Sequence, residues 1–199
     1  MTGDRSAPAP LPGDRFWVEE GLLLAGPYPG AIDREEAAAK LEAFLDVGIT
    51  TFVDLTEADE PSPTHIPLKP YDELLSKIAT RRGLNVRHVR MPIRDVSIPA
   101  QADMEAILDF IDGAIADGTP TYVHCCGGIG RTGTVVGCLG INHGIPRRTI
   151  LSELAALRAG TERAAKRSPE TEEQRRFIAD WQRTSSSERL ASNLIPPRS

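Results

Sequence analysis

The sequence predicts an α/β fold in which a central, mostly parallel sheet is flanked by helices. Short segments rich in apolar and β-branched residues alternate along the chain with longer segments of helical periodicity. Residues 49–55 combine β-branched and apolar residues in a short segment, which is typical of a buried strand. Further helical segments follow the last expected strand, so we expect extra helices at the C-terminal end of the fold.

The composition is that of an ordinary globular domain. The 199 residues are 40% hydrophobic and 26% charged, and the net charge of −5 argues against a nucleic-acid-binding protein. The longest apolar run is too short to span a membrane, and no secretory signal is visible. Three cysteines without a spaced framework favour a reducing, cytoplasmic environment. We expect a disordered leader over 1–14, a single domain over 15–183 and a disordered tail over 184–199.

The N-terminal half is expected to begin with a β-hairpin. A Glu-Glu-Gly turn separates its apolar segments, 16–18 and 22–25. The following helix has a capping-box pattern at 33–36, and a glycine ends its apolar stripe. The loop 57–70 then follows the strand 49–55, at the edge of the sheet where α/β proteins place functional groups. A helix over 72–82 and a strand over 84–90 complete this half.

The C-terminal half is expected to contain one strand and several helices. The strand covers 121–123, and the last helix has Ser168 as its N-cap and Pro169 as its first residue. The expected helices of this half are 104–118, 131–144, 146–160 and 168–183.

The segment 121–133 combines a strand, a Gly-rich turn and a helix start around Cys125. Backbone N–H groups of the turn and of the first helical turn converge there, and the helix dipole adds partial positive charge. Such surroundings favour the thiolate of a cysteine, and the fork of Arg131 can bind two phosphate oxygens. The segment therefore indicates attack by Cys125 on a bound phosphate or similar oxyanion. The positions expected to bind the phosphate are Cys126, Gly127, Gly128, Ile129, Gly130 and Arg131.

The order His124-Cys125-x5-Arg131-Thr132-Gly133 resembles the signature loop of the cysteine-dependent protein tyrosine phosphatases, nearest their compact dual-specificity branch. The Gly-Gly-Ile-Gly filling is similar to the cyclin-dependent kinase inhibitor phosphatase group and its bacterial relatives. The resemblance runs from about residue 15 to 182. It implies a phosphotyrosine-phosphatase-like fold and a phosphocysteine intermediate. It also implies that Thr132 hydrogen-bonds the cysteine sulfur, and that His124 tunes the thiolate through the loop backbone.

A leaving alkoxide or phenoxide needs a proton, so a carboxylic acid has to reach the rim of the phosphate site. Asp95 is the best candidate, because it lies on a loop after a strand and Pro92-Ile93-x-Asp95 resembles the general-acid loop of the family. Asp103 is weaker, since an acid at a helix start already has a capping role. Glu57 and Asp59 are placed to face the substrate, although solvent is the more ordinary environment for loop acids.

Hydrolysis of a phosphocysteine needs an oriented water molecule. The segment Ser168-Pro169-Glu170-Thr171-x-x-Gln174 resembles the distal glutamine segment of the family, which makes Gln174 the candidate for this role. The alternative is a glutamine on a helix surface.

Other residues are assigned ordinary structural roles. Tyr28 is expected to pack on prolines rather than to flank the pocket. Cys126 is expected to be a packed thiol rather than a redox partner, because adjacent cysteines form a strained ring. No metal or other cofactor is expected, since His65, His88 and His143 share no metal-ligand spacing.

These observations favour a protein phosphatase that acts on phosphotyrosine, with phosphoserine and phosphothreonine as further candidates. Its partner would be a phosphorylated protein or peptide. One alternative is a phosphatase of phosphoinositides or other small phosphate esters, which the absence of lysine at 126–130 disfavours. A sulfurtransferase would not need Asp95, Arg131 and Gln174 together. A phosphate-binding module without activity would require a lost catalytic group.

Overall fold

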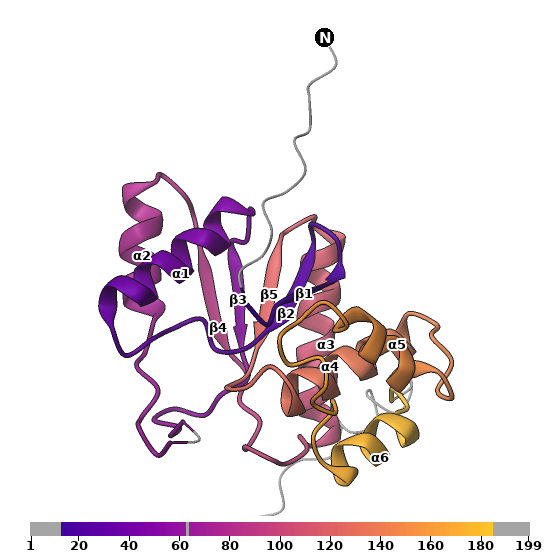
Figure 1. Cartoon of the computed structure of the whole chain (residues 1–199). Helices are drawn as coiled ribbons and strands as arrows, with labels where there is room; N and C mark the ends of the chain where they lie inside the picture. Colours follow the sequence, from indigo (N-terminus) through magenta and orange to yellow (C-terminus); the bar gives the residue numbers. More distant parts are fainter. Residues whose placement is uncertain (1–12, 63, 185–199) are drawn as a thin grey trace, which may run out of the picture.

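The computed structural model describes residues 13–62 and 64–184 (Figure 1). It has a five-stranded sheet of order β1-β2-β5-β3-β4, in which β1 and β2 pair antiparallel and the other neighbours pair parallel. The predicted mostly parallel α/β fold and the N-terminal hairpin are therefore confirmed. The expected leader and tail lie almost entirely outside the described residues. The strands are β1 (Phe16–Glu19), β2 (Leu23–Gly26), β3 (Thr51–Asp54), β4 (Arg87–Arg90) and β5 (Thr121–His124).

Helices cover both faces of the sheet, with α1 and α2 on one face and α3 and α4 on the other (Figure 1). The helices α5 and α6 pack against α4. No helix in the described ranges is long and apolar enough to cross a membrane. The helices are α1 (Arg34–Asp46), α2 (Asp72–Arg81), α3 (Gln101–Ala116), α4 (Gly130–Asn142), α5 (Ile150–Leu157) and α6 (Glu172–Asp180).

The alternation of side chains along the strands produces two apolar cores. Leu24, Phe52 and Tyr122 share a core with α1 and α2, because successive residues of a strand point to opposite faces. Their strand neighbours Val53 and Val123 pack against α3 and α4 instead. Both faces are buried, which explains why apolar residues stand next to each other in β3 and β5 instead of alternating with polar ones.

The parallel strands end together at one edge of the sheet. In the pairing register, His124 at the end of β5 lies between Gly26 at the end of β2 and Asp54 at the end of β3. Loops that leave these three strands therefore meet beside the loop that follows His124.

The helix expected to start at Pro146 begins four residues later, at Ile150. The N–H and hydroxyl of Thr149 both donate to the carbonyl oxygen of Pro146, which closes a separate turn before α5. Proline fixes its own φ but does not by itself propagate a helix.

The expected N-cap of the last helix is also wrong. Ser168 donates its hydroxyl to the Ile129 carbonyl at 2.7 Å, in the turn that leads into α4. The N-cap of α6 is Thr171, whose side chain accepts from the N–H of Gln174, and Gln174 accepts in return from the N–H of Thr171. The capping box, which satisfies two helix-terminal donors, thus begins the helix three residues later than expected.

Candidate active site

Cys125 lies directly after β5, in the turn that leads into α4. Its side chain is buried, and the N–H of Gly128 donates to its sulfur at 3.3 Å. No side chain caps the N-terminus of α4, so the free N–H groups of its first turn are available to an anion. Gly128 has a φ of +68°, and a Cβ there would lie 2.5 Å from the backbone of Gly26 and Pro27. Only glycine fits this position.

Arg131, in the first turn of α4, is 1% exposed and forms a bidentate ion pair with Glu60. Nη1 and Nη2 of the guanidinium each lie 2.6 Å from a different oxygen of the Glu60 carboxylate. Nη1 also donates to the carbonyl oxygens of Ile93 at 3.1 Å and Leu55 at 3.3 Å. Burial opposes the charge, but the hydrogen bonds to Glu60 and the nearby Cys125 and carboxylates raise the pKa of Arg131 above its ordinary value. The guanidinium is thus held in one plane and stays charged.

Glu60 is the main residue that sequence reasoning missed. It lies in the loop between β3 and α2 and is 5% exposed, in contrast to the solvated position typical of loop acids. The available signal was its place in an acid-rich loop at the carboxyl edge of the sheet.

Asp95 is brought to the same guanidinium from the loop between β4 and α3. Its Oδ1 lies 2.8 Å from Nη2 of Arg131, while its side chain remains 56% exposed. The next residue, Val96, has a φ of +59°, which is strained for a β-branched side chain. Asp103 lies in the first turn of α3, as expected.

Gln174 is fully buried, which rules out a position on the helix surface. Besides the capping box, its Nε2 donates to the carbonyl oxygen of Ser97 at 3.1 Å, on the same loop as Asp95. A Cβ at Gly130 would lie 3.0 Å from Nε2 of Gln174, so this amide packs against the start of α4. The glutamine therefore connects the loop that carries Asp95 with the Gly-rich loop 125–130, the candidate catalytic loop.

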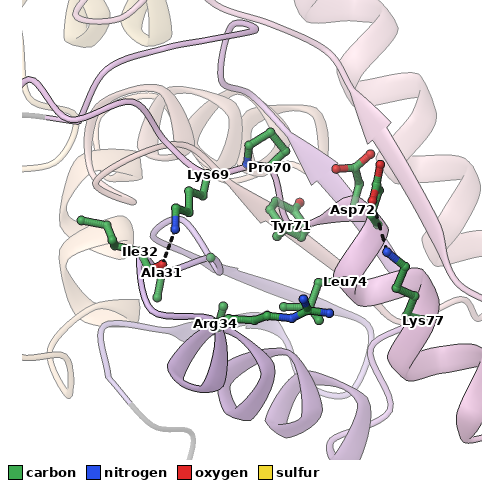
Figure 2. Close-up of a pocket in the computed structure, with 12 residues that line it drawn as sticks. Ala31, Ile32, Arg34, Lys69, Pro70, Tyr71, Asp72, Leu74 and Lys77 are labelled. Atoms are coloured by element: carbon green, nitrogen blue, oxygen red, sulfur yellow. Dashed lines mark hydrogen bonds and ion pairs between the residues drawn. The ribbon is translucent and has the colours of Figure 1, made fainter.

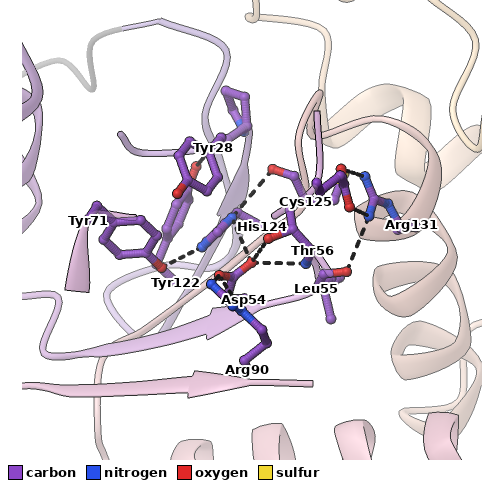
Figure 3. A network of polar contacts seen from close by, with 12 residues as sticks. Tyr28, Asp54, Leu55, Thr56, Tyr71, Arg90, Tyr122, His124, Cys125 and Arg131 are labelled. Atoms are coloured by element: carbon purple, nitrogen blue, oxygen red, sulfur yellow. Dashed lines mark hydrogen bonds and ion pairs between the residues drawn. The ribbon is translucent and has the colours of Figure 1, made fainter. Parts of the chain in front are cut away.

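His124 and its neighbours form a buried polar network behind Cys125 (Figure 3). Its Nδ1 lies 3.4 Å from the carbonyl oxygen of Cys125, and its Nε2 lies 2.6 Å from the hydroxyl of Tyr71. A carbonyl can only accept, so Nδ1 carries the proton and Nε2 accepts from the Tyr71 hydroxyl. Burial lowers the pKa of His124 to about 4 although Asp54 opposes this shift, so the imidazole is neutral near pH 7.

Asp54, at the end of β3, is the fully buried carboxylate of this network. Its Oδ1 accepts from the N–H and hydroxyl of Thr56 at 2.9 and 2.6 Å, and Oδ2 lies 3.2 Å from Nη2 of Arg90 and 3.3 Å from Nε2 of His88. Burial alone would raise the pKa of Asp54, but the hydrogen bonds from His88 and Thr56 and the nearby His124 hold it well below its usual range. Asp54 and Tyr71 had no role in the sequence reading.

The remaining predicted residues lie around the same loop. The hydroxyl of Thr132 is buried and has no hydrogen-bond partner among the described residues, so the expected hydrogen bond to the Cys125 sulfur is not formed in this structure. Cys126 is half-buried, and burial with the nearby Cys125 and Glu60 raises the pKa of its thiol to about 11. Tyr28 does flank the site, contrary to expectation: its N–H donates to the Cys126 carbonyl at 3.0 Å, and its ring packs edge-on against His124.

A cavity of about 330 Å³ opens beside Asp95 and is lined mainly by acids. Arg94 is the one basic residue of its lining, and the acids are Glu57, Asp59, Glu60 and Asp95. Negative charge therefore surrounds this side of the site.

Curated proteins related to this chain include one phosphatase. The chain is 29% identical over 132 residues to the phosphatidylglycerophosphate phosphatase PTPMT2 of Arabidopsis thaliana, a match that covers 65% of this chain and 49% of that protein. Other curated relatives, from Methanocaldococcus jannaschii, are matched over 31% and 52% of their lengths. The chain thus spans about half the length, or less, of these relatives.

Solved structures share the fold at low sequence identity. The core catalytic domain of the PP-IP phosphatase SIW14 from S. cerevisiae superposes with a TM-score of 0.60 at 16% identity, over 92% of this chain and 93% of that one. Kinase associated phosphatase gives a TM-score of 0.60 at 18% identity, over 86% of this chain and 94% of that one.

A family model described as "Swiss Army Knife protein, DSP-PTPase phosphatase domain" matches residues 17–178, which is most of the chain. The Gly-rich loop between β5 and α4, with its buried thiol and guanidinium, lies within this match. The protein therefore belongs to this family of dual-specificity-type cysteine phosphatase domains.

Proposed function

We propose that this phosphatase acts on phosphorylated polypeptides, and on phosphotyrosine in particular, through a phosphocysteine formed on Cys125. The observation that carries the proposal is the buried Cys125 sulfur at the uncapped N-terminus of α4, with the Gly128 N–H directed at it. A thiol in this position meets an oxyanion-binding surface built from backbone donors.

The first step is attack of the Cys125 thiolate on phosphorus, which forms a sulfur–phosphorus bond as the bond to the leaving oxygen breaks. Asp95 donates a proton to that oxygen. In the second step, water attacks phosphorus, Asp95 accepts its proton and the thiolate leaves. Gln174 orients the water, and the unpartnered hydroxyl of Thr132 stabilises the departing sulfur.

Two groups control the charge at the site. Glu60 orients Arg131, which binds the phosphate. When substrate enters, Asp95 breaks its ion pair with Arg131 and hydrogen-bonds to the leaving oxygen instead. His124 acts through the Cys125 carbonyl, since its proton lies on Nδ1 and its other nitrogen accepts from Tyr71. It thereby fixes the loop backbone rather than transferring a proton.

The charges beside the phosphate site favour a phosphopeptide over a polyphosphorylated head group. The turn 126–130 contains no cationic side chain, so it binds one phosphate through backbone groups. Glu57, Asp59 and Asp95 on the adjacent cavity repel additional phosphates held close to the first.

A small phosphate ester is the second candidate substrate. It is favoured by the relationship to the phosphatidylglycerophosphate phosphatase of Arabidopsis thaliana and by the fold shared with a yeast PP-IP phosphatase.

The test is turnover of a substrate panel by the full chain, with and without a metal chelator. The panel contains phosphotyrosine and phosphoserine peptides, phosphatidylglycerophosphate and phosphoinositides. We expect the highest kcat/KM with phosphotyrosine peptides, no effect of the chelator, and no turnover by Cys125→Ser. Cys138→Ala, at a buried cysteine outside the site, is the matched control. Preference for a lipid or inositol substrate would reassign the function, and binding without turnover by the wild type would indicate a phosphate-binding module.

A further inference from the structure

A second cavity, of about 500 Å³, lies between the N-termini of α1 and α2 (Figure 2). This volume is within the range of small-molecule and side-chain binding sites, about 300–1,000 Å³. Three basic residues line the cavity, together with two acids of the first turn of α2, and we call it the basic cavity. The basic residues are Arg34, Lys69 and Lys77, and the acids are Asp72 and Glu73.

The basic cavity opens at the same edge of the sheet as Cys125, because the chain enters α1 from the end of β2 and α2 from the loop after β3. Tyr71 lines the cavity and also donates to His124 behind the catalytic loop. Tyr28 packs edge-on against Tyr71 and is bonded through its N–H to the catalytic loop at Cys126. The cavity and the phosphate site therefore share an aromatic wall.

The cations of the cavity differ in how far their charge is already neutralised. Lys77 is paired with Glu73 at 3.3 Å, and Lys69 donates to the Ile32 carbonyl at 2.7 Å without an ion pair. Arg34 has neither an ion pair nor a side-chain hydrogen bond within the part of the chain that the structure describes. Figure 2 shows its side chain reaching across the cavity toward Leu74. The guanidinium of Arg34 is thus available for a bidentate ion pair with a carboxylate.

We propose that the basic cavity binds an acidic side chain of the phosphorylated polypeptide, through Arg34 and Lys69, while the phosphotyrosine occupies the site at Cys125. This inference rests on the proposed function and names the sequence context that the enzyme prefers. The two charged cavities then act together: the acids beside Asp95 repel anions there, and the basic cavity accepts one on the Tyr28 side.

The aromatic wall explains why a polypeptide fits better than one small ring. The rings of Tyr28, Tyr71 and His124 lie between the two sites, with centroids 5.3 to 5.6 Å apart. Of these rings only that of Tyr28 is partly exposed, so a ligand that reaches both sites passes over Tyr28. An extended peptide adds about 3.3 Å per residue, so side chains two or three positions from the phosphotyrosine lie about 7–10 Å along the chain and are the ones to test.

The experiment compares phosphotyrosine peptides that carry glutamate, alanine or lysine two or three residues from the phosphotyrosine, on either side. For the wild type we expect kcat/KM to be about 5–10 times higher with glutamate than with alanine at one of these positions, as for a single charged contact. Arg34→Glu should reverse this preference in favour of lysine, and Lys69→Met should reduce it. The readout is the ratio of acidic to neutral peptide, so a general loss of activity does not affect it.

Arg148→Glu is the matched control, because Arg148 is an exposed arginine in the turn before α5, away from both cavities. It should leave the acidic-to-neutral ratio unchanged. Equal turnover of all peptides by the wild type, or an equal change of the ratio with Arg148→Glu, would overturn the inference and leave the proposed function intact. If no phosphopeptide is turned over at all, the proposed function fails, and this inference fails with it.

Discussion

Two buried carboxylates, Asp54 and Glu60, belong to the same β3–α2 region but serve different sides of the catalytic loop. Asp54 accepts hydrogen bonds from Thr56 and from residues of β4, next to a neutral His124. Glu60 faces a full positive charge, in a two-point ion pair with Arg131. Figure 3 shows Asp54 and Arg131 on either side of Cys125.

The two carboxylates therefore have different roles. Asp54 stabilises the backbone of the catalytic loop, and Glu60 orients the guanidinium that binds the substrate. Asp54 is buried and both of its carboxylate oxygens accept hydrogen bonds, so this network fixes the backbone next to Cys125. The Glu60 side ends in a guanidinium whose Nη2 is shared with the exposed Asp95, so it can exchange partners. Changes on the Glu60 side should therefore act on catalysis, and changes on the Asp54 side mainly on stability.

The largest effect is expected for Arg131→Lys. Lysine keeps the charge but loses the planar fork, so kcat/KM for phosphotyrosine peptides should fall by about 10²–10³. Steady-state kinetics and binding of inorganic phosphate measure the two consequences. Near-normal kinetics would mean that the Arg131–Glu60 pair is only structural.

Asp95→Asn should give a loss that depends on the leaving group. A proton donor contributes about 10²–10⁴ when the leaving oxygen is basic, so phosphotyrosine and alkyl phosphates should lose most and activated aryl phosphates little. The matched control is Asp103→Asn. If Asp95→Asn loses equally on good and poor leaving groups, Asp95 is not the acid, and Asp103 or Asp59 is the next candidate.

Glu60→Gln should have a smaller effect. The amide keeps one hydrogen bond to Arg131 but loses the charge and the second acceptor, so we expect kcat/KM to fall about tenfold through a less fixed guanidinium. Asp59→Asn is the control, since Asp59 is a nearby loop acid with a φ of 60° that asparagine tolerates. A loss of kcat/KM no larger than that of the control would show that Glu60 does not orient Arg131 for catalysis.

The Asp54 side should show its effect in the pH dependence of stability. The pKa of His124 falls from 6.5 to about 4 on folding, so the unfolded chain binds a proton there that the folded chain does not. Its contribution is fully present above about pH 6.5 and is lost as the pH falls toward 4, by roughly 3 kcal/mol. Urea unfolding between pH 4 and 7 measures it. His124→Asn should weaken this dependence of the free energy of unfolding on pH. An unchanged dependence would show that other groups cause it.

Local patterns in the sequence predicted most of the fold. The hairpin, the apolar strands and the helix capped by Asp33 follow from periodicity and turn residues that act within a few positions. The starts of α5 and α6 could not be predicted from local patterns, because Pro146 and Ser168-Pro169 are as compatible with a turn as with a helix start. Which one forms depends on a distant partner, as in the Ser168–Ile129 hydrogen bond.

The candidate site was predictable where its residues are adjacent in sequence. Cys125 and Arg131 share one loop, whereas Glu60 lies 71 residues from Arg131 and Tyr71 lies 53 residues from His124. Such pairs depend on the strand order, which brings the ends of β3 and β5 together. The sequence places Glu60 in an acidic loop but does not distinguish it from its solvated neighbours.

Trapping of the intermediate tests the account most directly. If Gln174 positions the water, Gln174→Ala should slow breakdown of the phosphocysteine more than its formation, giving a burst of tyrosine of about one per enzyme. Rapid acid quench with a radiolabelled phosphotyrosine peptide should then place the phosphate on Cys125, with no label in the Cys125→Ser variant. Label on Cys126, or continued turnover without any labelled cysteine, would contradict a phosphocysteine at Cys125.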